Sequence, residues 1–434
     1  MKKSLLQIIA FLVTFSANAQ NFNWTSQTSG GTTKLNDVFF VDSLLGWVVG
    51  DDGVILNTKD GGKNWSSQTS DITEILRSVF FINDTLGWAV GGQVKKAIIK
   101  TTDGGENWIS LTADGISSNQ MYDIAFFDTN IGWLITFNSI YRTTDGGDSW
   151  VIEDYADRID TPTPRSIAIT SDTVAFVAGT RKKSVTNTSA DVFYRKTDIS
   201  PNLWDYSYFD PSPLSGDSFN DVEFINSDIG FAGSRNGRLY KKTDYNDAGI
   251  WELSTELTGN QSIYSIAFPT ETNGMFNSSV EISGNSYALI YHTSDSGETW
   301  SSSPDTIPDL ILAVLHAPDS LNAWIVGNNG KIYKGEIAGG DPPTSIKHVG
   351  LINDINLYPN PAKDVVNVAF KTKKSDLVNY RLLDMTGRIV KSGNWTSNST
   401  KSVFTLNISE LVNGVYLLSL STEDAVGTLR ILKE

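Results

Sequence analysis

The sequence has no cysteine among its 434 residues and only three histidines. The absence of cysteine excludes a disulfide framework, a thiolate metal site and a cysteine nucleophile. The three histidines are His292, His316 and His348, and the last falls in an expected linker. So few histidines argue against a histidine-based metal centre or a Ser-His-Asp triad. We therefore expect no metal and no cofactor.

Positive charge is also scarce, because 34 Lys and Arg stand against 49 Asp and Glu, giving a formal net charge of -15. This balance argues against nucleic acid or an anionic membrane surface as the main partner. Long apolar runs are missing as well, and no segment is long enough to predict a transmembrane helix. The one short apolar stretch, residues 5–15, follows Lys2 and Lys3 and precedes a small-x-small site at residues 17–19. We predict a signal peptide over residues 1–19 and a mature chain outside the cytoplasm.

What the sequence does have is an internal repeat built on the pattern Ser/Thr-x-Asp-x-Gly-x-x-Trp. Decayed copies end at Trp204 and Trp251. Counted from Trp24, the tryptophans that end the copies lie 41 to 54 residues apart, close to the length of one four-stranded propeller blade. The Asp, Gly and Trp positions of the four full copies are Asp60, Gly62 and Trp65; Asp103, Gly105 and Trp108; Asp145, Gly147 and Trp150; and Asp295, Gly297 and Trp300.

A second element repeats in step with the first and reads as two strands joined by a hairpin turn. Its seven copies begin at Asp37, Ser78, Asp123, Ser166, Asp221, Ser265 and Ala313. A third strand precedes each Asp motif and a fourth follows each Trp. We expect the aromatics of the second strand to form a core between blades, namely Trp47, Trp88, Trp133, Phe176, Phe231 and Trp324.

The seventh copy stops near residue 334 with three strands, whereas residues 21–27 look like a fourth strand without a blade before it. Pairing these two segments would close a ring and remove an exposed sheet edge. The fold class is therefore all-β, and we predict a seven-bladed β-propeller over residues 20–338.

The Asp pattern resembles the Asp-box, or bacterial neuraminidase repeat. Its chemistry is structural, because Asp can bond the turn backbone, Gly permits positive φ and Trp covers the hairpin. The resemblance implies a box on the blade periphery, away from the active face. The run VFFVDSLLGWVVGDDGVILNTKDGGKNW (residues 38–65) and its copy from residue 78 resemble photosystem II assembly and stability factors. Those relatives are non-enzymatic seven-bladed propellers that bind a membrane-protein client, so the resemblance implies fold and binding mode, not the client.

Candidate binding residues stand just before each inner-strand motif, where they should ring the central channel. They are Asn36, Arg77, Tyr122, Arg165, Asn220 and Tyr264, with Leu312 at the seventh position. Arg and Tyr are the residue types of recognition hot spots, and two cations in an acidic domain suit a carboxylate-bearing ligand. The alternative interpretation is that strand starts simply tolerate polar residues.

Beyond a Gly/Pro/Ser-rich linker at residues 339–349, the blade repeat ends. Residues 350–434 contain short strands with Gly-containing turns, which predict a small antiparallel β-sandwich. The motifs YPNPA (358–362), DMTGR (384–388) and LVNGVYLL (411–418) closely resemble the type A C-terminal sorting domain of the type IX secretion system of Bacteroidetes. That resemblance implies export by the signal peptide and then outer-membrane translocation guided by the tail, leaving the protein secreted or on the cell surface. An ordinary adhesive β-module is the alternative.

For the propeller we expect a non-catalytic binder of a protein or glycan partner. The competing class is a glycoside hydrolase, since sialidases and some glucanases are Asp-box propellers. The propeller's arginines include none in the Arg-Ile-Pro context that opens sialidases, and no carboxylate occupies the seven rim positions. A carboxylate pair for another glycosidase stays open. A purely structural surface protein is the third possibility.

Overall fold

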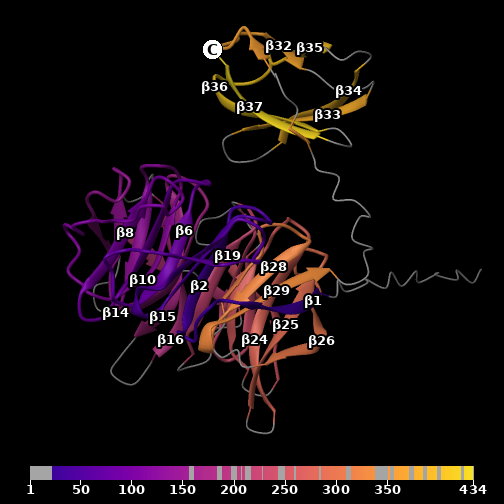
Figure 1. Ribbon diagram of the computed structural model, residues 1–434. Coiled ribbons are helices and arrows are strands. Elements are labelled where there is room, and N and C mark those ends of the chain that lie inside the picture. Colours follow the sequence, from indigo (N-terminus) through magenta and orange to yellow (C-terminus); the bar gives the residue numbers. More distant parts are fainter. Residues whose placement is uncertain are drawn as a thin grey trace, which may run out of the picture. The chain divides into compact units, whose positions relative to one another are not determined.

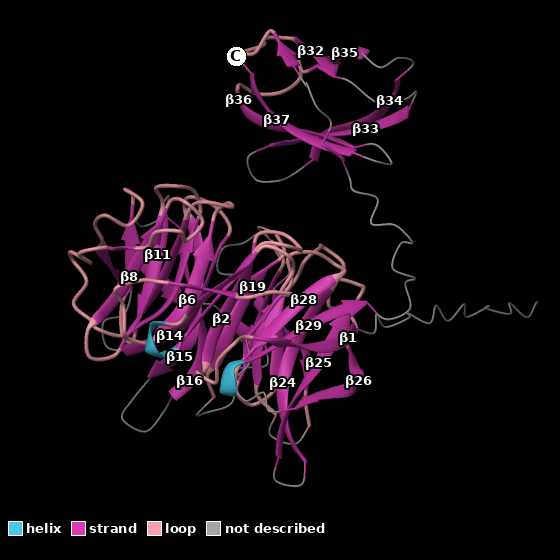
Figure 2. Ribbon diagram, viewed as in Figure 1, coloured by secondary structure: helices cyan, strands magenta, loops and turns pink. Residues whose placement is uncertain are grey.

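The computed structural model places the chain in two compact units, Met1–Ala338 and Gly339–Glu434. Both consist of strands, and among the described residues none lies in an α-helix. The two short cyan segments in Figure 2 are 3-10 turns, η1 (Asp51–Gly53) and η2 (Asn328–Gly330). The predicted signal peptide (1–19) and linker (339–349) lie outside the described residues. The structure describes residues 22–155, 161–182, 188–196, 203–206, 208–210, 217–226, 228–242, 250–258, 261–282, 285–308, 314–337, 350–351, 356–370, 376–384, 389–397, 402–421 and 425–433.

The first unit consists of seven blades that each contain four antiparallel strands, and we number blades by their innermost strand. The innermost strands are β2 (Leu35–Phe40), β6 (Leu76–Phe81), β10 (Met121–Phe126), β14 (Thr161–Ile169), β19 (Phe219–Phe224), β23 (Ile263–Ala267) and β27 (Val314–His316). The second strands are β3 (Gly46–Gly50), β7 (Gly87–Gly92), β11 (Gly132–Thr136), β15 (Val174–Lys182), β20 (Gly230–Ser234), β24 (Gly274–Ile282) and β28 (Asn322–Val326). The third strands are β4 (Ile55–Thr58), β8 (Lys96–Thr101), β12 (Ile140–Thr143), β16 (Thr188–Lys196), β21 (Arg238–Lys242), β25 (Asn285–Thr293) and β29 (Lys331–Ile337). The outer strands are β5 (Ser66–Gln68), β9 (Ile109–Ser110), β13 (Val151–Tyr155), β17 (Leu203–Tyr206), β22 (Ile250–Glu256), β26 (Ser301–Pro308) and β1 (Phe22–Thr28).

The two ends of the propeller sequence meet in blade 7. Strand β1 pairs antiparallel with β29, from Phe22 opposite Ile337 to Thr28 opposite Lys331. Figure 1 shows this as indigo β1 lying beside orange β29. The predicted ring closure is confirmed, and no blade is left with three strands.

Among the described residues, stacked aromatic rings join neighbouring blades at five junctions. Trp47 of β3 stacks on Phe81 of β6 with ring centroids 3.6 Å apart, and Trp324 of blade 7 stacks on Phe40 of blade 1 at the same distance. The six second-strand aromatics predicted to form this core are all buried. Glycine precedes Trp47 because a Cβ on Gly46 would lie 2.5 Å from the Phe40 ring. Burying such a ring stabilises the fold by about 1.5–3 kcal/mol.

Blades 4 and 5 depart from the simple repeat at their outer strands. Strands β13 and β17 pair in parallel, which joins blades 3 and 4 into one eight-stranded sheet. A further strand, β18 (Tyr208–Asp210), pairs in parallel with β22 and gives blade 5 a fifth strand. These are the two blades whose copies of the Asp motif are decayed in the sequence.

The second unit is a β-sandwich, as predicted. One sheet contains β30 (Gly350–Leu351), β37 (Ala425–Lys433), β36 (Gly414–Ser421), β33 (Asp376–Asp384) and β34 (Ile389–Ser397). The other contains β31 (Asn356–Tyr358), β32 (Val365–Phe370) and β35 (Ser402–Asn407). Side chains of both sheets, such as Val366 and Leu418, share one core. The YPNPA motif is tied to the last strand, because the Leu432 amide donates to Asn360 Oδ1 at 2.8 Å and the Ala362 amide donates to the Leu432 carbonyl at 2.8 Å.

Candidate functional site

The predicted rim residues share a backbone feature that the sequence did not reveal. In six innermost strands the pairing register shifts by one residue at the rim position, so that each of these residues is the extra residue of a β-bulge. A bulge re-aims the side chain at its position and is common beside functional sites. The six bulged residues are Asn36, Arg77, Tyr122, Arg165, Asn220 and Tyr264, whereas Leu312 lies outside the described residues.

Two of these residues join neighbouring blades. The Asn36 side-chain amide donates to the carbonyl oxygen of Leu76 in blade 2 at 2.9 Å and to Asp51 Oδ1 at 2.8 Å. Asn220 repeats the first contact by donating to the Ile263 carbonyl of blade 6 at 2.8 Å. Both amides are thus engaged within the fold, which agrees with the alternative interpretation for these two positions.

The two rim arginines are placed differently. Arg77 donates to the carbonyl oxygen of Gly92, and its guanidinium carbon lies 5.3 Å from the centre of the Tyr122 ring. Arg165 is exposed. Within the described part of the chain, neither guanidinium forms an ion pair, so both keep donors for an anionic ligand. Tyr264 accepts a hydrogen bond from Ser279 Oγ at 3.3 Å.

Two apolar side chains beside the rim were missed in the sequence. Val94, in the turn after β7, is 74% exposed, and Phe137, in the turn after β11, is 52% exposed. The loop that enters β10 touches both turns, because Asn119 donates to the Val94 carbonyl at 2.9 Å and the Phe137 amide donates to the Gln120 carbonyl at 3.2 Å. We call Arg77, Val94, Tyr122 and Phe137 the rim patch. The only sequence signal for Val94 and Phe137 is an apolar residue in an otherwise polar turn.

Below the rim, a belt of alternating Asp and Ser links the blades around the channel. Ser78 Oγ donates to Asp123 Oδ1 at 2.7 Å, and the other Asp123 oxygen accepts the Ile167 amide of blade 4 at 2.9 Å. Asp37 and Asp221 likewise accept backbone amides from blades 2 and 6. We call Asp37, Ser78, Asp123, Ser166, Asp221 and Ser265 the belt. Its alternation was visible in the repeat, but its role depends on contacts between blades.

The belt faces a central cavity of about 430 Å³ that is lined by the innermost strands of all seven blades. Burial raises the pKa of Asp37 to about 8 and that of Asp123 to about 6. Burial also raises the pKa of Glu223 to about 8, with the Asp221 carboxylate adding to the effect. His316, which lines the same cavity, has its pKa lowered to about 4 by burial. The channel therefore holds carboxyl groups that ionise reluctantly and an uncharged imidazole.

The Asp boxes lie at the turns between third and outer strands, at the blade periphery. In blade 1, Thr58 Oγ1 and the Asn64 amide donate to Asp60 Oδ1, both at 2.9 Å, and the Asn64 side chain donates to Oδ2 at 2.7 Å. The Asn64 hydrogen bonds hold the pKa of Asp60 below its usual value. Gly62 has a φ of +82°, which favours glycine. The same bonds recur around Asp103, Asp145 and Asp295.

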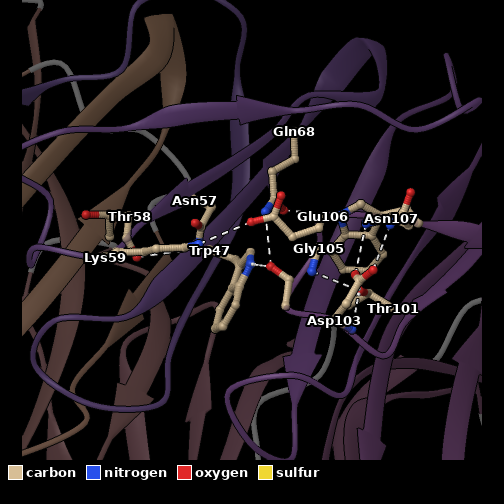
Figure 3. A network of polar contacts seen from close by, with 12 residues as sticks. Trp47, Asn57, Thr58, Lys59, Gln68, Thr101, Asp103, Gly105, Glu106 and Asn107 are labelled. Atoms are coloured by element: carbon tan, nitrogen blue, oxygen red, sulfur yellow. Dashed lines mark hydrogen bonds and ion pairs between the residues drawn. The ribbon is translucent and has the colours of Figure 1, made fainter.

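Each box also contacts the preceding blade. Between blades 1 and 2, Trp47 Nε1 and the Gln68 side chain both donate to the Gly104 carbonyl, at 3.2 and 3.1 Å, and Trp108 Nε1 donates to Gln68 Oε1 at 3.1 Å (Figure 3).

The box aspartates have both carboxylate oxygens occupied by donors of their own turns. Among the described residues, no three His, Asp or Glu side chains are grouped to hold a metal.

The fold and these repeats define a seven-bladed Asp-box propeller followed by a sorting-domain type of β-sandwich. Residues 16–150 match the family model of the photosynthesis system II assembly factor YCF48, and residues 356–434 match the secretion system C-terminal sorting domain. The sorting domain indicates type IX secretion to the cell surface or the extracellular space. A search of curated proteins gives no match. Within the described residues no helix is long and apolar enough to cross a membrane.

Solved structures with this fold include a YCF48 bound to a D1 peptide, at 18% identity and a TM-score of 0.56, covering 75% of this chain and 98% of that one. YCF48 from Cyanidioschyzon merolae is 17% identical with a TM-score of 0.55, covering 72% and 98%. A structure of U3-55K is 10% identical with a TM-score of 0.53, covering 72% and 98%. These likenesses show the β-propeller fold.

Proposed function

We propose that the chain is a non-catalytic propeller that binds a protein partner through its channel rim after export by its sorting domain. The observation that carries the proposal is the pair of rim arginines, Arg77 and Arg165, which have no carboxylate partner among the described residues although the chain is strongly acidic. An acidic protein that leaves cations unpaired at bulged positions is suited to an anionic group of a ligand.

The rim patch supports a peptide segment as the ligand. A guanidinium can bind a carboxylate through two parallel hydrogen bonds, while Tyr122, Phe137 and Val94 offer apolar surface beside it. We infer a segment that carries both an acidic and a large apolar side chain. The solved complex of a YCF48 with a D1 peptide supports a peptide ligand, because a propeller of this fold binds one. A glycan is the other ligand class, but the exposed ring of Phe137 would contact a sugar less specifically than the rim patch would contact a peptide.

A glycoside hydrolase is the second candidate function, favoured by one observation. Glu223 has its pKa raised to about 8, as a general acid requires, and Asp221 lies two residues away. However, the two Asp221 oxygens accept hydrogen bonds from Ser166 Oγ at 2.6 Å and from the Ile266 amide at 2.7 Å. A carboxylate engaged in this way is poorly placed to act as nucleophile or base, so we rank the binder first.

The test is capture and cross-linking of envelope and secreted proteins by the full chain and by the Arg77→Ala/Arg165→Ala variant. The matched control is Lys59→Ala/Lys63→Ala, which removes the same charge at the periphery of blade 1. We expect a partner that cross-links near Tyr122, is lost in the arginine variant and is kept in the lysine variant. If the arginine variant and the lysine variant capture the partner equally, the rim is excluded as the binding site. Hydrolysis of a polysaccharide panel by the parent protein would favour the glycosidase.

A further inference from the structure

The central cavity has a second tier of side chains below the belt. Counting two residues on from the six belt positions gives Phe39, Phe80, Ala125, Ala168, Glu223 and Ala267, and the strand pairing places His316 at the same level in blade 7; all of them line the cavity. Five of these seven blades therefore present a hydrocarbon side chain at this level, and blade 7 presents an imidazole. Blade 5 alone presents a carboxyl group.

Glu223 differs from the belt aspartates in having no hydrogen-bond partner among the described residues. Each belt aspartate accepts a backbone amide from the next blade, and Asp123 and Asp221 also accept a serine hydroxyl. In the part of the chain that the structure describes, no side chain or backbone group forms a hydrogen bond or ion pair with the Glu223 carboxyl group. Glu223 is half-buried, and a carboxyl group there that accepts no hydrogen bond adds no contact that holds the fold together.

The surroundings of Glu223 leave room and supply an apolar wall. Its neighbours at the same level in blades 4 and 6 are alanines, Ala168 and Ala267. Across the ring, Phe39 packs against Phe80 with centroids 5.4 Å apart and against His316 at 4.8 Å. The charged group that acts on Glu223 is the Asp221 carboxylate, which has the same sign. No cation faces the cavity from any of the seven innermost strands among the described lining residues.

We propose that Glu223 is the receptor for a primary ammonium group at the end of an aliphatic chain. The ammonium would donate to the Glu223 carboxylate, with Asp221 adding negative potential, while the methylene chain would lie against Phe39 and Phe80. A charge-assisted hydrogen bond of this kind is strong when water is largely excluded. A cavity of about 430 Å³ has space for a chain of the length of a lysine side chain. This site lies deeper than the rim and does not depend on the partner proposed above.

The test is calorimetric titration of the full chain with n-pentylammonium chloride at a pH above the pKa of Glu223, with 1-pentanol as the uncharged probe. The variant is Glu223→Ala, which installs the residue that blades 3, 4 and 6 already carry at this level, and Glu223→Gln is a second variant of nearly the same size. We expect the parent to bind the amine and not the alcohol. Both variants should lose roughly tenfold or more in amine affinity.

Thermal unfolding separates a binding role from a structural one. Because the carboxyl is unpaired, Glu223→Ala should be at least as stable as the parent. A less stable Glu223→Ala, unchanged amine affinity in both variants, or equal binding of amine and alcohol would each overturn the proposal. The Arg77→Ala/Arg165→Ala variant should keep the amine affinity of the parent, so failure of the rim hypothesis and failure of this one are distinguishable.

Discussion

The propeller uses aspartate in two concentric positions, and the two sets have opposite electrostatics. The box aspartates lie at the periphery, where donors of their own turn surround the carboxylate and hold the pKa of Asp60 low. The belt aspartates lie in the channel, where burial raises the pKa although hydrogen bonds from the next blade oppose the rise. The difference teaches that a box aspartate holds one turn, whereas a belt aspartate joins two blades and does so at an electrostatic cost.

The largest expected effect is an opposite pH dependence of the two sets. The folded-state pKa of Asp37 is raised from 3.8 to about 8, so the unfolded chain loses this proton first and stability falls as pH rises through that range. The lowered pKa of Asp60 contributes stability above its unfolded value, which is lost as pH falls in acid. Urea unfolding across pH should therefore give a maximum in the mildly acidic range.

The control for this prediction is Asp37→Asn, which keeps an oxygen acceptor without the titration. It should flatten the loss of stability between mildly acidic and mildly alkaline pH. A parent protein that gains stability steadily up to pH 8 would contradict the assignment of raised pKa values to the belt.

Next in size is the removal of a belt carboxylate. Asp123→Ala leaves the Ser78 hydroxyl and the Ile167 amide without their acceptor, and we expect a loss of about 3 kcal/mol in the free energy of unfolding. Denaturant titration of the parent and variant measures it. Asp123→Asn, which keeps one acceptor oxygen, should lose less than half as much. Equal losses would mean that charge, and not the bonds between blades, is what matters.

The matched box variant lies in the same blade. Asp145→Ala removes the acceptor for Thr143 Oγ1 and for the amide and hydroxyl of Ser149, but water reaches this turn and can replace the carboxylate. We expect a loss of about 1 kcal/mol, as for the removal of a helix cap. The same titration applies. If Asp145→Ala cost more than Asp123→Ala, the ranking of belt above box would be wrong.

The smallest effect is expected for the ion pair that links two neighbouring boxes. Lys59 Nζ and Glu106 Oε1 are 3.2 Å apart, but both side chains are 68% exposed. Lys59→Ala should change the free energy of unfolding by less than about 0.5 kcal/mol. A larger loss, removed by high salt, would show that the boxes interact electrostatically around the periphery.

The repeat was sufficient to predict the blades, the aromatic core and the closure of the ring, because each depends on apolar spacing that recurs along the chain. The bulges at Arg77 and Tyr122 were not predictable, since one extra residue at a strand end does not disturb an apolar pattern that begins after it. Val94 and Phe137 lie in turns, where hydrophobicity carries no periodic signal. The parallel pairing of β13 with β17 was not predictable either, because both are outer strands and the repeat assigns them to separate blades.

For the site, the repeat predicted candidate rim positions but not the contacts that their side chains make. Asn36 and Asn220 contact the next blade, and that contact exists only once the blades are arranged in a ring. The alternation of Asp and Ser in the belt was present in the repeat starts from Asp37 to Ser265. Recognising it required knowing that those positions face one shared channel. Glu223 was hidden for the same reason, since one glutamate in an apolar strand is unremarkable until its neighbours are known.

The pairing of β1 with β29 has a consequence for the order of events during synthesis. The strand that completes blade 7 is translated first, and its partner emerges only after six blades have left the ribosome. Until then β1 has no sheet to join, so the nascent chain stays an open arc with two unsatisfied edges. A protein that must be exported gains from such a delay, because the last step of folding waits until nearly the whole propeller sequence has been made. Any tag or fusion should therefore leave residues 22–28 free to reach β29.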